Sequence, residues 1–251
     1  MSAGELAVER SGRVAVLRIE RDARRNALSD ALLASLQRTL RACDGDDGIG
    51  ATVLTGAGSG FSAGSDLKEL GSMSLDEMIA HEARTAAFCR EIGALRKPVV
   101  AAVEGFALGG GFVLAVSCDV VVTSRAARWN LPEVEIGWIP PWGLESLVQR
   151  VGVSKARQLV LGGFPFTGEE AVRLGVADHV ADDGRALEGA TGIAARLATL
   201  PPEAVASAKL YFATFASRNG ESGDALASRL FREDCRNPVA VSTLTKFGVR
   251  T

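Results

Sequence analysis

The chain has 251 residues, 47% of them apolar and 23% charged, as is ordinary for one large globular domain. The formal net charge of -2 excludes a broad basic surface for nucleic acid. No apolar run reaches the ~20 residues that cross a bilayer, and the N-terminus lacks the apolar stretch of a secretory signal, so we expect a cytoplasmic protein. Four dispersed cysteines and two histidines give no metal-binding spacing, and we expect no metal site.

Strands and helices alternate through the first half of the chain. Apolar spacing predicts a hairpin, a helix capped by Ser29 or Asp30, a strand, a long helix begun by Ser74, a strand, a short helix opened by a Gly-rich turn and a strand: residues 6–19, 32–45, 51–56, 74–97, 99–105, 108–115 and 119–124. Gly-rich loops at strand ends make this the βαβ pattern of a mainly parallel, covered sheet. Beyond Pro140 the pattern is helical almost to the end. The pair Pro201-Pro202 predicts a core domain at 1–200 and a C-terminal helical segment at 201–251.

Two Gly-rich loops, residues 56–65 and 108–111, are the candidates for ligand binding. Neither has the GK[ST] ending of a phosphate loop or the spacing of a dinucleotide fingerprint. The segment Gly60 to Gly64 matches the G-x-S-x-G motif of serine hydrolases, and Asp119 and His179 follow in the right order. That motif needs a sharp strand-to-helix turn, whereas several loop residues precede Ser62, so we do not favour a serine hydrolase.

The two loops taken together favour an oxyanion hole. Ser65 and Gly110 each follow a strand and stand at or beside a helix start, where a backbone N–H has no partner within the helix. Two such N–H groups that meet at one oxygen stabilise a negative charge on it. For either loop alone, close packing of a helix on a strand is the simpler explanation.

Three segments decide between these possibilities by their order and spacing: VLTGAGSGFSAGSDLKEL at 53–70, KPVVAAVEGFALGGGFVLAVSCDVVV at 97–122 and LPEVEIG at 131–137. With them, the chain from about Leu6 to Phe215 resembles the enoyl-CoA hydratase/isomerase (crotonase) superfamily. The resemblance implies an α/β crotonase (ClpP/crotonase-like) fold, a spiral of ββα repeats with a helical C-terminal trimerisation region. It also implies a homotrimer or a dimer of trimers, a coenzyme A thioester substrate, and no cofactor besides the coenzyme A of that substrate.

The resemblance also assigns binding residues. It places the two oxyanion N–H groups at Ser65 and Gly110 and the adenine contact at Ala63. The stretch that contacts coenzyme A, besides Gly110, is Ser65, Asp66, Leu67 and Lys68. Because position 65 supplies a backbone donor, we expect its serine side chain to matter little. Arg24 is a candidate for contact with coenzyme A phosphates, and a solvated surface charge explains it equally well.

Of the family's two glutamate positions, only one holds an acid here. The first is Val113, which cannot transfer a proton, and the second is Glu133; Glu135 is the alternative inward carboxylate. A single glutamate resembles Δ3,Δ2-enoyl-CoA isomerases and phenylpropenoyl-CoA hydratase-lyases. We therefore expect isomerase-type proton transfer. An enoyl-CoA hydratase or aromatic hydratase-lyase is the first alternative, and a catalytically weak acyl-CoA-binding protein is the second.

The environment expected for Glu133 is apolar, with Val113, Trp138, Ile139 and Trp142 around it, so burial should raise its pKa. Together with Trp129, the two tryptophans favour an aromatic or bulky acyl group. His81 is expected on a helix surface. The ending RNPVAVSTLTKFGVRT lacks the family's usual EGxxAFxEKR, which leaves trimer contacts open.

Overall fold

The computed structural model describes residues 5–248, without the side chains of residues 216–218; residues 1–4 and the last three residues of the predicted C-terminal segment lie outside the described part. The strands are β1 (Leu6–Ser11), β2 (Val14–Ile19), β3 (Ala51–Gly56), β4 (Val99–Val103), β5 (Phe106–Leu108), β6 (Val120–Ser124), β7 (Arg128–Asn130), β8 (Phe166–Thr167) and β9 (His179–Ala181). The helices are the 3-10 turn η1 (Asp22–Arg24), α1 (Asp30–Gly45), α2 (Leu67–Leu70), α3 (Leu75–Ala94), α4 (Gly110–Val116), α5 (Leu144–Gly162), α6 (Gly168–Leu174), α7 (Ala186–Leu197), α8 (Pro202–Asp234) and α9 (Pro238–Lys246).

The main sheet has the order β1-β2-β3-β4-β6-β9, and all its pairs are parallel except the β1–β2 hairpin. A smaller sheet, β5-β7-β8, stands beside it. The predicted hairpin, strands and helices of the first half are therefore present, and Ser29, not Asp30, caps α1 by accepting from the Leu32 N–H. The expectation of helices almost throughout the region beyond Pro140 was too simple. That region also contains β8 and β9, which are only two and three residues long and show no alternating pattern.

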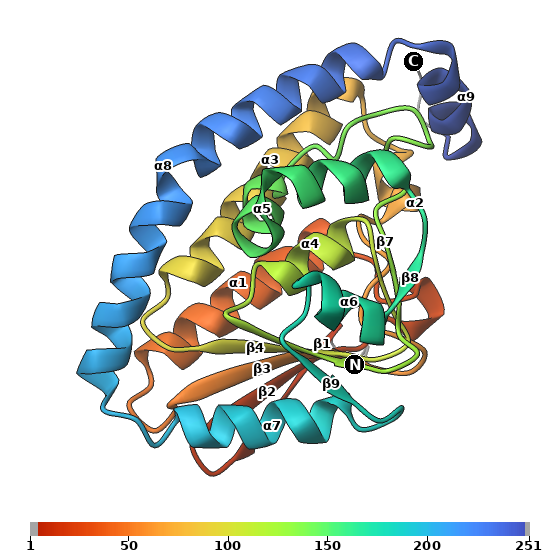
Figure 1. The fold of residues 1–251 in the computed structure, drawn as a ribbon. Coiled ribbons are helices and arrows are strands. Elements are labelled where there is room, and N and C mark those ends of the chain that lie inside the picture. The colour runs from red at the N-terminus through yellow and green to blue at the C-terminus, as the bar shows by residue number, and fades with distance from the viewer. Residues whose placement is uncertain (1–4, 249–251) are drawn as a thin grey trace.

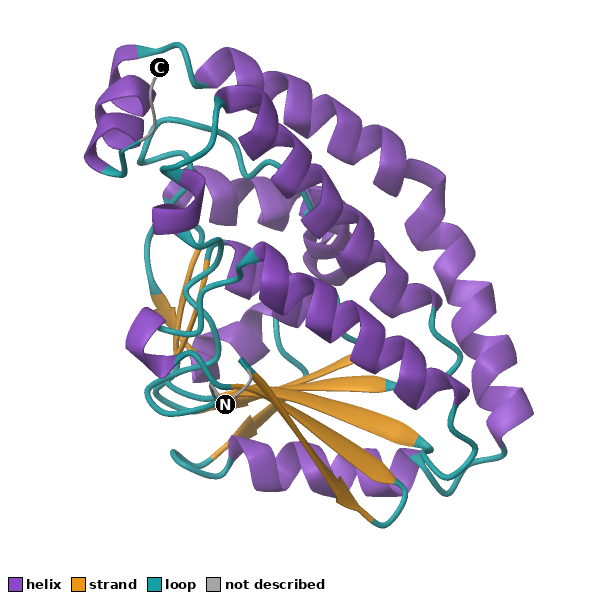
Figure 2. Ribbon diagram, turned by 180° about the vertical axis from the view of Figure 1, so that it is seen from behind, coloured by secondary structure: helices purple, strands orange, loops and turns teal. Residues whose placement is uncertain are grey.

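Two helical layers cover the main sheet, as Figures 1 and 2 show. One face, with Val14, Val53 and Val100, packs on the alanines of α7. The other face packs on α1, α3 and α4, whose buried side chains form the largest core. Strands covered on both faces are mostly apolar, which is why β4 is a continuous apolar run and β3 departs from one only at two buried threonines, Thr52 and Thr55.

The C-terminal helices run over the outside of this body. α8 begins at Pro202 and packs along α3 and α5, and α9 then turns back at the far end of the molecule (Figure 1). Pro202 and Pro238 stand in the first turn of their helices, where a missing N–H costs nothing. Leu244 of α9 joins a core with Trp138, Leu70 and Phe231. The helical segment is thus folded onto its own subunit.

Within residues 5–248 no helix combines the length and apolar character of a membrane span. No three His, Cys, Asp or Glu side chains within that range gather in a way that would hold a metal ion.

Candidate active site

The two Gly-rich loops lie side by side. An isolated parallel bridge joins Ser62 to Ala107, with the Leu108 N–H donating to the Ser62 carbonyl at 3.0 Å. Because parallel segments advance together, three residues further along both loops Ser65 comes to lie beside Gly110. A Cβ on Gly110 would be 3.5 Å from the Ser65 nitrogen, so the two segments are in contact.

The amides of Ser65 and Gly110 face the same space. Leu28 donates to the Gly64 carbonyl at 2.8 Å and accepts from Asp66 at 3.0 Å, so the N–H of Ser65 between them points to the opposite side. Gly110 is the first residue of α4, where an N–H has no acceptor within the helix. Across residues 5–248, neither amide donates to the protein. Two unpaired donors on adjacent loops have the arrangement of an oxyanion hole.

Glu133 lies on the other side of this space, in the segment that follows β7. It is 8% exposed, and Oε2 has no hydrogen-bond partner in the described part of the chain. A Cβ on Gly109 would be 2.9 Å from Oε1, so the carboxylate lies directly against this turn, where a φ of +52° favours glycine. Burial raises the pKa of Glu133 to about 7, and the nearby charge of Glu82 acts in the same direction. Glu135 is exposed, so of the two acids Glu133 is the inward one.

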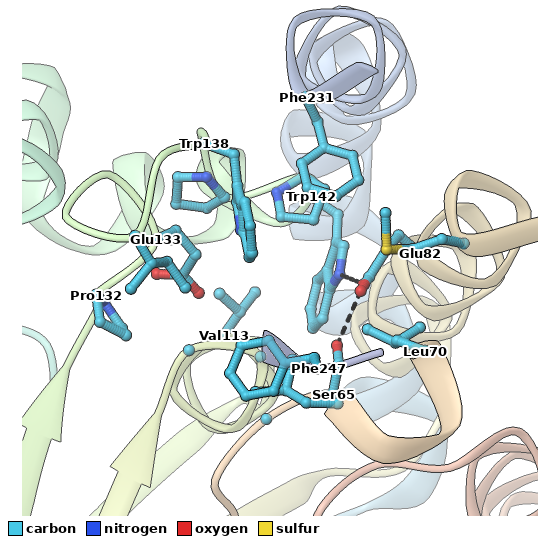
Figure 3. Close-up of a pocket in the computed structure, with 18 of the residues that line it drawn as sticks. Ser65, Leu70, Glu82, Val113, Pro132, Glu133, Trp138, Trp142, Phe231 and Phe247 are labelled. Carbon is cyan, nitrogen blue, oxygen red and sulfur yellow. Dashed lines mark hydrogen bonds between the residues drawn. The ribbon is translucent and has the colours of Figure 1, made fainter. Parts of the chain in front are cut away.

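A cavity of about 110 Å³ connects these groups. Figure 3 shows Glu133 and Glu82 on opposite sides, with Val113 and Trp142 between them. The predicted site residues that line the cavity are Ala63, Ser65, Leu67, Gly110 and Glu133. Trp138 and Trp142 also line it, as expected. Trp129 does not: it is fully buried in the main core against Phe112.

Three predicted binding residues lie away from the cavity. Arg24 in η1 and Lys68 in α2 have exposed side chains. Asp66 is buried and engaged: it pairs with Arg21 at 2.9 Å and caps α2 through the Lys68 and Glu69 amides. Its carboxylate therefore holds the loop together, and its backbone is engaged as well, with the N–H donating to the Leu28 carbonyl and the carbonyl accepting from the Leu70 amide.

The serine hydrolase motif does not form a catalytic triad. Ser62 is fully buried, and its hydroxyl donates to the Asn26 carbonyl at 2.8 Å and accepts from the Gly64 amide at 3.2 Å. His179 is exposed on β9. Ser62 thus serves to shape the turn that presents Ser65.

Comparison with known proteins agrees with this geometry. A family model described as enoyl-CoA hydratase/isomerase matches residues 9–243. The chain belongs to this family. It is 39% identical over 206 residues to the 2,3-dehydroadipyl-CoA hydratase of Escherichia coli (strain K12), covering 82% of this chain and 80% of that protein. It is 34% identical over 211 residues to the short-chain-enoyl-CoA hydratase of Clostridium acetobutylicum, covering 83% and 81% of the two chains.

Solved structures of the enoyl-CoA hydratase/isomerase family share the fold. An enoyl-CoA hydratase/isomerase from Mycobacterium paratuberculosis superposes with a TM-score of 0.86 at 28% identity, covering 97% of this chain and 98% of that one. The predicted crotonase fold is therefore confirmed, and the protein is an enzyme of this family. Its departure from a two-glutamate member of the family is Val113, whose side chain packs directly against Gly143.

A second carboxylate, which was not predicted from the sequence, lines the cavity. Glu82 of α3 is 5% exposed, accepts from the Ser65 hydroxyl at 3.0 Å and from the Trp142 indole N–H at 2.6 Å. The serine side chain at position 65 is therefore engaged, contrary to our expectation that it matters little. A signal was present: Glu82 falls four residues after Met78 and four before Ala86, on the buried stripe of its helix.

The expectation for His81 was also wrong. Its side chain is 1% exposed, with Nδ1 placed 2.9 Å from Asp30 of α1. Helix α3 is buried over a wider arc than its apolar residues indicate, because α1 covers one flank and α8 another. Polar residues of α3 therefore lie in the interior with specific partners.

The C-terminal segment contributes the cover of the cavity. Phe231 from the end of α8, Leu244 from α9 and Phe247 after it all line the cavity, and Phe247 stands near Ser65 in Figure 3. The Phe247 carbonyl lies so close to Gly71 that a side chain there would collide with it. The divergent ending of this chain is thus part of its own active-site wall.

Proposed function

We propose that this enzyme moves a proton between C2 and C4 of a 3-enoyl-CoA thioester, the reaction of a Δ3,Δ2-enoyl-CoA isomerase. The coenzyme A of the substrate would run along Ala63 and the 65–68 stretch, with Arg24 near its phosphates, and no further cofactor takes part. A homotrimer or a dimer of trimers is the assembly that we propose from the family. The observation that carries the proposal is the buried carboxylate of Glu133, whose Oε2 has no hydrogen-bond partner among the described residues, facing the same cavity as two unpaired amides.

The mechanism follows from the placement of these groups. Ionised Glu133 takes a proton from C2, and the C2–H bonding electrons move into a dienolate whose oxygen accepts from the Ser65 and Gly110 amides. The C3=C4 electrons then take the same proton from Glu133 at C4, which leaves a C2=C3 double bond and restores the carboxylate. One carboxylate that reaches both carbons is sufficient, because the proton is only relocated.

The surroundings of Glu133 favour relocation of a proton over addition of water. A bound water needs two to four polar partners. In the described structure the neighbour of Glu133 at the first glutamate position is Val113, which offers none. The cavity volume of about 110 Å³ suits an acyl chain of a few carbons, since a cavity of ~150 Å³ holds a benzene ring.

Hydration of an enoyl-CoA is the second candidate. Two observations favour it: the relatives described above are named as hydratases, and Glu82 brings a second carboxylate to the cavity. An aromatic acyl group, suggested by the tryptophans, would have to fit between Trp138 and Trp142.

The two candidates separate in a direct assay. We expect 3-hexenoyl-CoA to be converted to its 2-enoyl isomer, and crotonyl-CoA to be hydrated at least ~100-fold more slowly, because general acid–base assistance to water is worth about that factor. Product analysis by chromatography measures both. Hydration of crotonyl-CoA at an equal or greater rate would establish the hydratase instead.

The pH dependence of the isomerisation tests the assignment of the base. Because Glu133 must be ionised to accept a proton and its pKa is about 7, kcat/KM should fall with acidity below that pH, about tenfold per unit. An ordinary exposed glutamate would place this limb near its usual pKa of about 4.5. Initial rates from pH 5 upward locate the limb, and an acidic position contradicts the assignment.

A further inference from the structure

Glu82 is a buried carboxyl group that the proposed mechanism does not use. It stands on α3 across the cavity from Glu133, and its two oxygens lie within hydrogen-bond distance of two other cavity-lining side chains, Ser65 and Trp142 (Figure 3). Among the described residues it forms no ion pair with Lys, Arg or His. An ionised carboxylate without a cationic partner is costly to bury.

A negative charge on Glu82 would also oppose the reaction, because of where this side chain lies relative to the oxyanion site. Its Oε1 is 3.0 Å from the hydroxyl of Ser65, the residue whose amide faces the oxyanion site. A carboxylate at that distance would repel the enolate that the two amides stabilise, in a setting where little solvent screens the charges. A neutral carboxyl would reinforce the same site, because it can donate a hydrogen bond.

The hydrogen-bond partners allow one consistent chain for the neutral form. The Trp142 N–H is a donor only, so Oε2 is the acceptor and the acidic hydrogen resides on Oε1. From there it donates to the Ser65 oxygen, which releases the hydrogen of the Ser65 hydroxyl for another acceptor. We propose that Glu82 acts as a neutral acid that strengthens the oxyanion hole through the Ser65 hydroxyl, and that the enzyme works with Glu133 ionised and Glu82 protonated.

This inference rests on the proposed function only in that an enolate forms; it holds equally for an isomerase and for a hydratase. Burial raises the pKa of Glu82, in the direction that the neutral form requires. The other titratable groups that act on it are His81 on its own helix, Asp30 of α1, which holds His81 and Arg84, and Glu133 across the cavity. From α8, Asp224 and Arg232 pair with Arg90 and Asp76.

The test measures enolate formation alone. The reaction is the exchange of the C2 hydrogens of butanoyl-CoA for deuterium in buffered heavy water, monitored by mass spectrometry. This exchange needs the base and the oxyanion hole but no double bond in the acyl chain. For the native enzyme we expect a bell-shaped rate profile: a rise as Glu133 ionises and a fall at higher pH as Glu82 ionises.

Glu82→Gln is the decisive variant, because glutamine copies the neutral acid. Its oxygen accepts from Trp142 and its NH₂ donates to Ser65. We expect a plateau rate within about threefold of the native one, an unchanged rising limb, and loss of the falling limb. If the falling limb persists in this variant, or if the variant is as slow as Glu82→Ala at every pH, the inference is wrong. A rising limb that moves to lower pH also overturns it, because Glu82 would then be ionised first.

Three further variants separate the remaining explanations. Ser65→Ala keeps the amide and removes the hydroxyl, so it should lower the exchange rate about tenfold. In that background Glu82→Ala should cost little more, because both substitutions break the same chain of hydrogen bonds; additive losses would contradict a shared chain. Glu91→Gln removes a carboxylate of α3 that binds Arg41 and Gln37 outside the site, and should keep the native profile.

The variant His81→Asn should keep the falling limb of the rate profile. If this variant loses the falling limb, His81 is the titrating group. Loss of exchange in all variants and in the native enzyme would instead refute the proposed function.

Discussion

Replacing Glu133 with glutamine is expected to lower kcat for thioester isomerisation by about 10³-fold, within the range for loss of a positioned acid–base group. Glutamine keeps the size of the side chain but cannot carry the proton from C2 to C4. Binding of the acyl-CoA should change little, because the oxyanion amides remain. Steady-state kinetics and isothermal titration with a saturated acyl-CoA measure the two effects separately.

The same substitution should stabilise the folded protein at alkaline pH. A carboxyl whose folded pKa is about 7 against an ordinary 4.5 favours folding below the lower value, and that contribution is lost as pH rises to the higher one. At pH 8 the buried charge costs about 3 kcal/mol, which Glu133→Gln removes, so urea denaturation should show a more stable variant at pH 8 and little difference at pH 4. Glu135→Gln, two residues away and exposed, is the matched control and should leave rate and stability unchanged. Full activity in Glu133→Gln would refute the mechanism.

Gly64→Ala is expected to lower kcat/KM by about 100-fold, because a displacement of catalytic groups by ~1 Å has that effect. Gly64 has a φ of +91°, which alanine rarely adopts, and its Cβ would stand 2.8 Å from the Gly110 nitrogen. Either the turn rotates or the two loops separate, and both movements misalign the amides of Ser65 and Gly110.

The control for this prediction is Gly192→Ala in α7. That glycine is helical and exposed, and an added Cβ would contact nothing within 4 Å, so alanine should raise the free energy of unfolding by about 0.5–1 kcal/mol without changing the rate. Thermal denaturation and kinetics of the two variants, measured together, distinguish misaligned donors from general instability. Native kinetics in Gly64→Ala would show that the two amides do not bind the enolate oxygen.

Local pattern was enough to locate most of the chain that bears the site. The largely apolar segments at β3 and β4 indicate covered parallel strands, and the glycines after them mark the loops that carry Ser65 and Gly110. The motif order around these loops identified the family, and the Pro-Glu pair of the LPE motif singled out Glu133. The strands and loops follow from local pattern, whereas the choice of Glu133 over Glu135 came from the family resemblance that the motifs carry.

The tertiary structure decided what surrounds those groups. Glu82 belongs to the site because α3 turns this face toward Ser65 and Trp142, residues 17 and 60 positions away in the chain. Asp66 is occupied by Arg21, and His81 is buried by α1, for the same reason. The wall formed by Phe231, Leu244 and Phe247 depends on where α8 ends and α9 turns back. Burial of a polar side chain is a property of all the elements packed around it, so a single segment of sequence does not determine it.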